Sequence, residues 1–318
     1  MHYCERKQPI IIANRASREM AAQVAPLLGL ELTEMDIREF ADGEIYHAFP
    51  CSLSGHDLIL IAATPDDSSF QELLDLIAGA RYWNALSVNV VIPYLGYSTM
   101  ERAKPESGEI PKGITRARQL FRARPDYVAF IDLHDEAVMH THSGEVRIRH
   151  LWTERLAAEE IRKLHCGTSG INESMVLVSP DYGFSKRVGR LASLLDCPHT
   201  AANKDRYGQD KTIVGQLSSV LQGRTAIICD DMIRTGGSML QTVDRCLEAG
   251  AVEVLVMATH LVLAGGARQA FIAKGIRRIL GANTYPGRKS DDLLQVFSVA
   301  PLIAGELKNY LGLEPNMA

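Results

Sequence analysis

Short apolar runs alternate along the chain with longer segments in which apolar residues recur every three or four positions. The runs predict buried strands, and the longer spacing predicts amphipathic helices. In the first half, strands are expected at Ile10–Ala13, Leu58–Ala63, Val88–Ile92 and Val128–Asp132, and helices at Ser17–Leu28, Phe70–Trp83 and Thr115–Arg122. This alternation predicts an α/β fold with a mostly parallel sheet flanked by helices.

The second half repeats the alternation. Strands are expected at Met175–Ser179, Thr225–Cys229 and Val254–Thr259, and helices at Lys186–Leu195, Ser238–Ala249 and Ala267–Lys274. Three strand starts recur after about 165 residues, which indicates a duplicated domain: Ile10 with Met175, Leu58 with Ala226, and Val88 with Val252. We expect domains at residues 1–150 and 151–318, joined in a helix predicted at Leu151–Leu164 or in the turn after it.

Composition narrows the function only a little. The 318 residues are 46% hydrophobic and 23% charged, which is ordinary for a globular protein with sizeable cores. A formal net charge of −4 gives no general attraction to nucleic acid. The six cysteines form no Cys-x-x-Cys pair, and neither a signal peptide nor a long apolar span is evident. We therefore expect a cytoplasmic protein with neither a nucleic-acid nor a membrane partner.

The clearest sign of chemistry lies between Thr225 and Ala249. A predicted strand leads into Asp230 and Asp231, at the strand end where open α/β sheets bind ligands. The predicted helix then begins at a group of hydroxyls and bare N–H groups that suits a phosphate: Thr235, Gly236, Gly237 and Ser238. Adjacent acids beside a phosphate cradle suit a ligand with a vicinal diol and a phosphate, such as a sugar phosphate.

A purely structural interpretation of this stretch is that the acids end a strand and the glycines make a turn. The context favours a site, because only Met232 and Ile233 separate the acids from Arg-Thr-Gly-Gly-Ser between a buried strand and a helix. The equivalent stretch of the first half, beginning at Thr64, has two acids but no paired glycines. Only the second domain is therefore expected to hold the sugar phosphate.

Other polar residues are ambiguous by themselves. His134 and Asp181 each follow a predicted strand, where a structural role is as reasonable as a metal or phosphate ligand. His140 and His142 follow without a cysteine partner and are interpreted as loop residues, because their spacing is a poor zinc signature.

Two further polar segments are expected to have a functional role only if a nucleoside triphosphate binds nearby. Lys204 and Arg206 lie in a run typical of a solvated loop, but they could neutralise charge on phosphoryl oxygens. The segment with Phe40, Asp42 and Glu44 is typical of a turn, although its aromatic ring could stack on a base whose edge the acids contact.

Together these motifs resemble the ribose-phosphate diphosphokinases, or phosphoribosyl pyrophosphate synthetases, from about Ile10 to Ile303. The matching segments are Phe40–Glu44, Ile92–Tyr97, Asp132–His134, Ser179–Asp181, Lys204–Arg206, Asp230–Ser238 and Ala258–His260. The resemblance implies two duplicated phosphoribosyltransferase-type I domains, the first on the nucleotide side and the second on the ribose 5-phosphate side. It also implies Mg²⁺-dependent transfer of the β,γ-diphosphoryl group of ATP, or another nucleoside triphosphate, to the 1-hydroxyl of ribose 5-phosphate.

The resemblance further implies a role for each residue. Ribose 5-phosphate would be bound by Asp230, Asp231, Thr235, Gly236, Gly237 and Ser238; the nucleotide by Phe40, Asp42, Glu44, Glu101 and Arg102; the metal by His134 and Asp181; and catalysis would rest on Lys204 and Arg206. Because the family often supplies the Phe40–Glu44 loop across a subunit interface, the resemblance implies a homo-oligomer.

Three segments depart from the usual family pattern. Ser98–Arg102 replaces Ala-Arg-Gln-Asp-Arg and, with Gly108-Glu109, resembles the plant-type second class, which accepts several nucleoside triphosphates and does not depend on inorganic phosphate. Arg234 stands where the family has an acid, and Met139–His142 replaces a segment of the family's regulatory site.

Two alternative functions are considered. A non-catalytic homologue could bind nucleotide or sugar phosphate and regulate a partner enzyme, but the presence of Lys204, Arg206, His134 and Asp181 disfavours it. A phosphoribosyltransferase shares the acid pair and phosphate loop, but the duplicated architecture disfavours that class.

Overall fold

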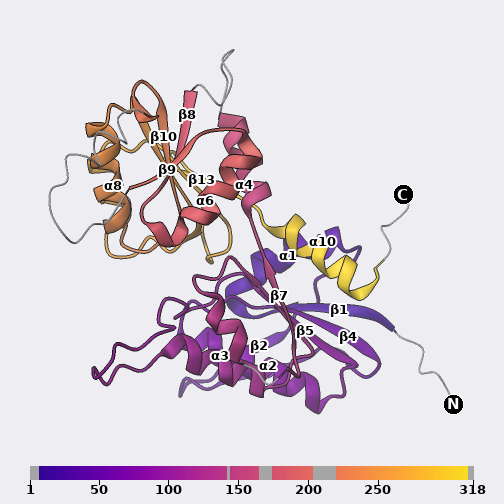
Figure 1. The fold of residues 1–318 in the computed structure, drawn as a ribbon. Helices are drawn as coiled ribbons and strands as arrows, with labels where there is room; N and C mark the ends of the chain where they lie inside the picture. The colour runs from indigo at the N-terminus through magenta and orange to yellow at the C-terminus, as the bar shows by residue number, and fades with distance from the viewer. Residues whose placement is uncertain (1–6, 142–143, 165–173, 203–219, 314–318) are drawn as a thin grey trace. The chain divides into compact units, whose positions relative to one another are not determined.

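The chain divides into two compact units in the computed structural model, which describes residues 7–141, 144–164, 174–202 and 220–313 (Figure 1). The first unit consists of Met1–Leu151 together with Ala300–Ala318, and the second of Trp152–Val299. Each unit is built on its own sheet, so the two are described separately.

The described residues of the first unit form a five-stranded parallel sheet in the order β1-β4-β5-β6-β7. Its strands are β1 (Lys7–Ala13), β4 (His56–Ile61), β5 (Ser87–Ile92), β6 (Tyr127–Ile131) and β7 (Arg147–Leu151). Its helices are the short 3-10 helices η1 (Arg15–Ser17) and η2 (Glu136–Thr141), and α1 (Arg18–Leu27), α2 (Asp67–Tyr82), α3 (Lys112–Arg122) and α10 (Ala300–Leu311).

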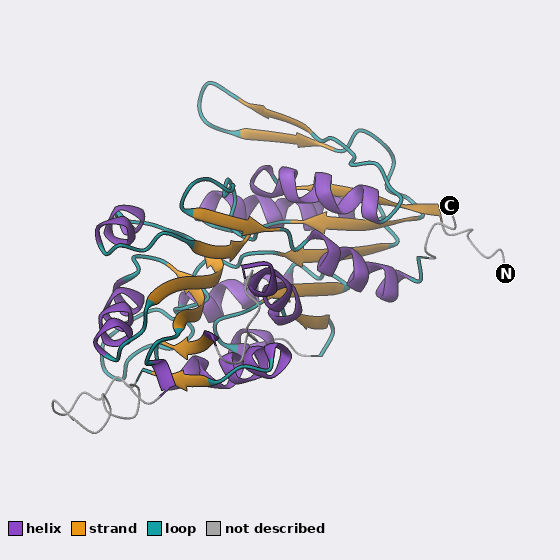
Figure 2. Cartoon of the chain, turned by 90° about the horizontal axis from the view of Figure 1, so that it is seen from above, coloured by secondary structure: helices purple, strands orange, loops and turns teal. Residues whose placement is uncertain are grey.

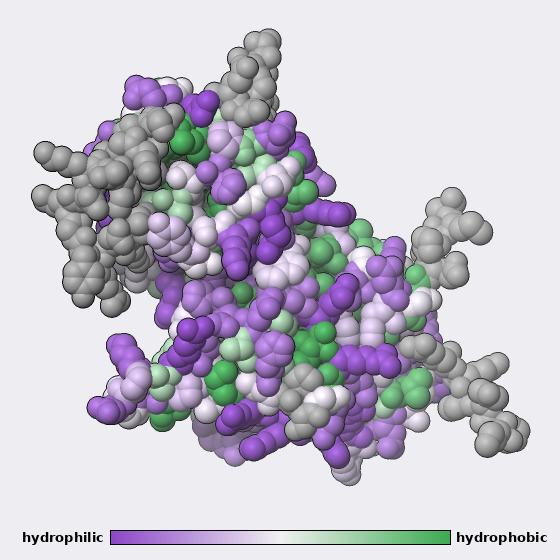
Figure 3. Space-filling model, in the orientation of Figure 1, coloured by the Kyte–Doolittle hydropathy of each residue, from purple (hydrophilic) through white to green (hydrophobic). Residues whose placement is uncertain are grey.

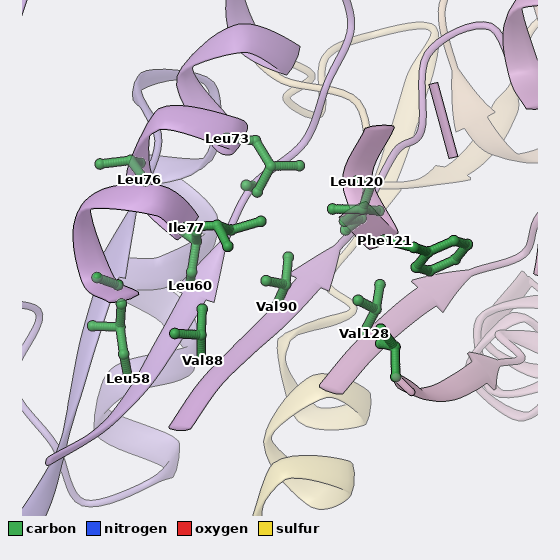
Figure 4. Close-up of a cluster of buried hydrophobic side chains, with 14 of the residues drawn as sticks. Leu58, Leu60, Leu73, Leu76, Ile77, Val88, Val90, Leu120, Phe121 and Val128 are labelled. Atoms are coloured by element: carbon green, nitrogen blue, oxygen red, sulfur yellow. The ribbon is translucent and has the colours of Figure 1, made fainter. Parts of the chain in front are cut away.

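Alternate residues of these strands face opposite sides of the sheet, as the pleat requires. One set meets the buried faces of α2 and α3, and Figure 4 labels the side chains concerned: Leu58, Leu60, Leu73, Leu76, Ile77, Val88, Val90, Leu120, Phe121 and Val128. The buried residues of α1 lie outside this cluster, and α1 packs on β1, β4 and α10. Helices therefore cover both faces of the sheet.

The described residues of the second unit form a six-stranded parallel sheet in the order β13-β12-β11-β10-β8-β9. Its strands are β8 (Met175–Ser179), β9 (His199–Ala201), β10 (Thr225–Ile233), β11 (Glu253–Leu261), β12 (Ile279–Ala282) and β13 (Leu294–Phe297). Its helices are α4 (Glu154–Leu164), α6 (Tyr182–Leu195), α8 (Gly237–Glu248) and α9 (Ala267–Ala273). Helices α8 and α9 share one buried cluster with the sheet, and α4 packs against α6.

The two sheets repeat one topology. The order β1-β4-β5-β6-β7 corresponds strand by strand to β8-β10-β11-β12-β13. Even the edge strand β9 beside β8 has a counterpart, because Leu32 forms a parallel bridge with Ile11 of β1. The predicted pair of α/β domains with parallel sheets is confirmed.

The last helix of each repeat packs on the other unit. Helix α4 follows β7 of the first sheet but packs on α6 of the second unit, whereas α10 follows β13 of the second sheet but packs on α1 of the first. Within the first unit, the hydroxyl of Tyr127 donates a 2.7 Å hydrogen bond to Glu306 of α10, and its ring stacks on Tyr310 at 4.0 Å. The expectation of one domain from 151 to 318 is therefore wrong for α10, which completes the first unit.

The turn expected around Phe40–Glu44 is present, and it connects two strands that were not expected, β2 (Asp36–Glu39) and β3 (Ile45–Ala48), which form an antiparallel hairpin. Seen from above, this hairpin projects from the sheet and helices of its own unit (Figure 2). Phe40 begins its connecting turn and is 52% exposed, with its ring in an edge-to-face contact with Tyr46 of β3.

The described surface is mixed in polarity. On the face drawn in Figure 3, hydrophilic residues predominate and hydrophobic ones gather only in small patches. Among the described residues, no helix has the length and apolar character needed to cross a membrane.

Candidate functional site

The acid pair lies inside strand β10, which runs on to Ile233 rather than ending at Cys229 as expected. Asp230 is paired in register with Ala258 of β11, so the acids are held by the sheet. Asp231 is only 4% exposed, and its N–H donates to Oδ1 of Asp230 at 2.9 Å. A carboxylate pair fixed by a strand is preorganised for a ligand, because little rotamer freedom remains to be lost on binding.

Burial and like charge act together on Asp230. Desolvation raises the pKa of its carboxyl well above the usual value, and the neighbouring Asp231 and the more distant Asp181 raise it further. The hydrogen bond from the backbone of Asp231 opposes this shift only in part. Without a ligand, the pair is therefore costly, and hydroxyl donors would relieve that cost.

The N-terminus of α8 follows the acids and has no side-chain cap. Gly236 takes the N-cap position with φ +79°, and Gly237 begins the helix. Thr235, Gly237 and Ser238 are exposed. The first backbone N–H groups of a helix have no partner within the helix, so this end suits an anion.

The corresponding helix of the first unit is closed by its own residues. The carboxylate of Asp66 accepts the N–H of Ser69 at 2.8 Å, and the Ser69 hydroxyl accepts the N–H of Asp66, which forms a capping box at α2. Asp67 accepts a 2.6 Å hydrogen bond from Arg116, and a hydrogen bond from Tyr97 lowers the pKa of its carboxyl. The acids of this copy are thus used structurally, which supports placing the sugar phosphate in the second unit.

A second glycine pair, not singled out from the sequence, lines the loop. Leu263 and Ala264 donate their N–H groups to the carbonyls of Ile233 and Arg234, each at 2.8 Å. A Cβ on Gly265 would lie 3.8 Å from Cγ2 of Thr235. The Gly265-Gly266 pair, six residues after the end of the predicted strand Val254–Thr259, was the available signal, since paired glycines mark a turn or loop.

Two alanine variants of neighbouring glycines should have different effects: Gly236→Ala should lower stability, and Gly237→Ala should weaken ligand binding. A Cβ at Gly236 would lie 2.7 Å from Cε2 of the buried Phe271, and its φ is positive. We expect Gly236→Ala to destabilise the protein by about 2 kcal/mol or more. A Cβ at Gly237 meets no atom within 4 Å, so Gly237→Ala should leave the melting temperature nearly unchanged but weaken ribose 5-phosphate binding.

Thermal unfolding and calorimetric titration with ribose 5-phosphate measure the two effects. Tight sugar-phosphate binding by Gly237→Ala would contradict the placement of the phosphate at this helix end. An unchanged melting temperature for Gly236→Ala would contradict the requirement for glycine at that position.

Asp181, expected as a metal ligand, is the N-cap of α6 in the second unit. Its carboxylate accepts a hydrogen bond from the N–H of Phe184 at 3.2 Å. Its negative charge also raises the pKa of the Asp230 carboxyl. The structure thus brings Asp181 and the acid pair to the same carboxyl edge of the second sheet.

In the first unit, the loops after β5 and β6 are tied together. Nη2 of Arg102 donates to Oδ2 of Asp135 at 2.7 Å, and its Nε lies 3.6 Å from Oε1 of Glu101. The Glu101 side chain is 13% exposed, and its Oε2 has no hydrogen-bond partner among the described residues. His134, directly before Asp135, is exposed, so it lies in the same pair of loops as Glu101 and Arg102.

The remaining predicted residues lie elsewhere. Phe40, Asp42 and Glu44 occupy the hairpin turn, where the N–H of Glu44 donates to Oδ1 of Asp42 at 3.1 Å. Lys204 and Arg206 lie outside the described residues, as does His142.

The donor set suits a metal shared with a substrate. Within the described part of the chain, no group of three or more His, Cys, Asp or Glu side chains could hold a metal ion. Mg²⁺ commonly takes one or two protein carboxylates and completes its shell with water and substrate phosphates. Asp181, just after the end of β8, could serve as one such carboxylate.

Topology and loop together define a class of protein: a duplicated phosphoribosyltransferase-type fold in which the second copy keeps the acid pair and open helix end. Residues 9–113 match the family model described as the N-terminal domain of ribose phosphate pyrophosphokinase, and residues 153–285 match the phosphoribosyl transferase domain. The chain belongs to the ribose-phosphate pyrophosphokinase family, which confirms the family resemblance seen in the sequence.

Curated relatives and a solved structure match nearly the whole chain. The ribose-phosphate pyrophosphokinase of Methanosarcina mazei is 31% identical over 300 residues, covering 94% of this chain and 95% of that protein. The Bacillus caldolyticus enzyme of the same name is 29% identical over 308 residues, covering 96% and 95%. The crystal structure of phosphoribosylpyrophosphate synthetase from Mycobacterium smegmatis aligns with a TM-score of 0.83 at 28% identity, covering 96% and 99%.

Proposed function

We propose that this chain is a ribose-phosphate diphosphokinase that transfers the β,γ-diphosphoryl group of ATP to the 1-hydroxyl of ribose 5-phosphate. The oxygen of that hydroxyl attacks the β-phosphorus, the bond from this phosphorus to the bridging oxygen of the α-phosphate breaks, and AMP leaves. The observation that carries the proposal is the N-terminus of α8, which follows Asp230 and Asp231 and has no side-chain cap. The corresponding helix of the first unit, α2, is capped by its own residues.

The second unit is proposed to hold the acceptor. Asp230 and Asp231 would accept hydrogen bonds from the ribose hydroxyls, while the loop from Thr235 to Ser238 would bind the 5-phosphate. This division leaves the 1-hydroxyl oriented by groups already fixed by β10 and α8, so that positioning supplies much of the catalysis.

The donor side is assigned to the first unit and to cations. Phe40, Asp42 and Glu44 would contact the base, and Glu101 and Arg102 would serve the nucleotide. Separately, Lys204 and Arg206 would offset the charge on the transferred group, while His134 and Asp181 would hold Mg²⁺ with the triphosphate. When bound, the metal would neutralise phosphate charge as the bridging oxygen departs. We further propose a homo-oligomer, since the exposed Phe40 turn stands on a hairpin apart from the body of its unit. A cytoplasmic location is also proposed.

One assay tests the reaction. The pure protein is incubated with ribose 5-phosphate, Mg²⁺ and ATP, and AMP and phosphoribosyl diphosphate are measured. Formation of both in equal amounts is expected. A lack of AMP with every nucleoside triphosphate tried would reject a diphosphokinase and favour the non-catalytic homologue.

The Ser98–Arg102 segment predicts a relaxed choice of donor. Its Arg102 is engaged by Asp135, and Thr99 stands where the usual family pattern has an arginine. We expect GTP or CTP to support appreciable rates in the same assay. Strict use of ATP would mean that this departure from the family pattern does not affect donor choice.

A further inference from the structure

The β2–β3 hairpin holds the turn assigned to the nucleotide, yet little of it touches the rest of the first unit. Its strands pair with each other from Asp36↔Ala48 to Glu39↔Ile45, and their contacts with other elements are few. A two-stranded hairpin by itself is at best marginally stable in water. The position of its turn therefore depends on what holds the base of the hairpin.

Apolar side chains anchor the two ends of the hairpin. Met35 precedes β2 and Phe49 follows β3, and both pack against the buried cluster beneath α2. The ring of Phe49 passes so close to α2 that a Cβ on Gly79 would lie 3.1 Å from its Cε2. These contacts hold the two ends of the hairpin, but they do not by themselves set the orientation of its strands.

A buried carboxylate supplies the remaining attachment. Glu72 of α2 is 3% exposed, and its Oε1 lies 3.5 Å from Nε2 of His47 in β3. The same carboxylate accepts the backbone N–H of Arg15 at 3.0 Å and its Nε–H at 3.1 Å. Nη2 of Arg15 also donates to the Ser68 hydroxyl at 3.3 Å, so its guanidinium is fixed on both sides.

This arrangement joins three separate elements through one side chain: α2, the start of η1, and β3. A carboxylate is buried at a cost unless it is paired and hydrogen-bonded, so its partners are held firmly. His47 pairs in register with Ile37 of β2, which passes the restraint to both strands.

We propose that Glu72 is a positioning residue for the nucleotide donor, which holds the β2–β3 hairpin through His47 so that Phe40, Asp42 and Glu44 meet the base. The inference rests on the proposed function, because that function assigns the hairpin turn to the nucleotide. Glu72 itself contacts no substrate. Its effect should appear in donor binding and leave the acceptor side unchanged.

Glu72→Gln tests this role because the amide keeps the shape of the side chain but loses its charge and one acceptor. Nε2 of His47 makes no hydrogen bond among the described residues, so its 3.5 Å contact with the Glu72 carboxylate is electrostatic. We expect KM for ATP to rise on the order of tenfold when that carboxylate loses its charge, while KM for ribose 5-phosphate and kcat stay within about threefold. Hydrogen exchange of the amides in residues 36–48 should become faster, with exchange in β10 and α8 unchanged.

Two further variants make the outcome specific. Glu34→Gln removes an exposed carboxylate that pairs with Arg18 in the same unit, and should change none of these values. His47→Ala should raise KM for ATP as Glu72→Gln does. The double variant should raise it no further, since both changes remove the same contact between Glu72 and His47.

The inference is overturned if Glu72→Gln leaves KM for ATP and hydrogen exchange in the hairpin as in the wild type. It is also overturned if this variant lowers the melting temperature and kcat and raises KM for both substrates alike. Should the wild type form no AMP, the proposed function fails by itself. Hydrogen exchange then still decides whether Glu72 restrains the hairpin.

Discussion

Asp230→Asn should produce a protein that is more stable than the wild type and almost inactive. Asp230 is half-buried beside Asp231 in the same strand, and desolvation with the like charge of Asp231 raises the pKa of its carboxyl well above the usual value. An amide removes that charge and keeps the shape. We expect a gain of about 1–2 kcal/mol at neutral pH, with a rise in melting temperature of roughly 2–6 °C.

The gain should depend on pH in a defined direction. In the unfolded chain an Asp ionises near its ordinary pKa of about 3.9, whereas the folded chain retains the proton to a higher pH. The stability that this carboxyl gives below about pH 4 is therefore lost as pH rises through its folded pKa. The difference in melting temperature between Asp230→Asn and the wild type should be largest near pH 7–8 and shrink toward pH 4.

Activity should move the opposite way. Replacing a charged acceptor of the ribose hydroxyls by an amide should lower kcat/KM by on the order of 100-fold. Asp292→Asn, an exposed change of the same chemistry, is the matched control and should alter neither quantity. Full activity of Asp230→Asn would remove Asp230 from the binding site, whereas a lower melting temperature at pH 7 would contradict the argued cost of its charge.

Lys204→Ala should reduce turnover on the order of 100- to 1,000-fold while ribose 5-phosphate binds almost as before. The protein carries a net charge of −4 and must neutralise a triphosphate locally. Charge on the phosphoryl oxygens changes most as the bridging bond breaks, so a cation aimed at the transferred group acts mainly in the transition state.

Single-turnover rates and calorimetric binding of ribose 5-phosphate separate these effects. Lys204→Arg keeps the charge with a different shape, and it should recover part of the lost rate. If Lys204→Ala weakens acceptor binding as much as turnover, the side chain serves the ground state and its catalytic assignment is wrong.

The fold was largely predictable because its signals are local. Each sheet centre is an apolar run, and strands such as Leu58–Ala63 and Val88–Ile92 were expected within a few residues of β4 and β5. Strands β7, β12 and β13 were missed, because β7 (Arg147–Leu151) mixes charged and apolar residues, and β12 and β13 are only four residues long. Short or half-exposed strands take their stability from neighbours that a sequence pattern does not reveal.

The candidate site residues also divide into those with a local sequence signal and those without one. Asp230 and the Gly236-Gly237 pair were identified because strand, acids, glycines and helix follow one another in the chain. Glu72 and Asp135 were not, because their partners lie 25 residues or more away: His47 for Glu72 and Arg102 for Asp135. Spacing along the sequence carries no sign of such long-range pairs, although Asp135 directly follows the predicted ligand His134.

The helices that the two repeats exchange make each half of the chain an incomplete protein. A fragment ending at Leu151 lacks α10, and the apolar face of α1 that α10 covers would be open to water. A fragment beginning at Trp152 keeps α4 for its own α6, but carries α10 with Ile303, Leu307 and Leu311 uncovered. Split there and mixed, the fragments should recombine, because one supplies the helix that the other needs. Each repeat therefore depends on the other for one helix of its packed unit.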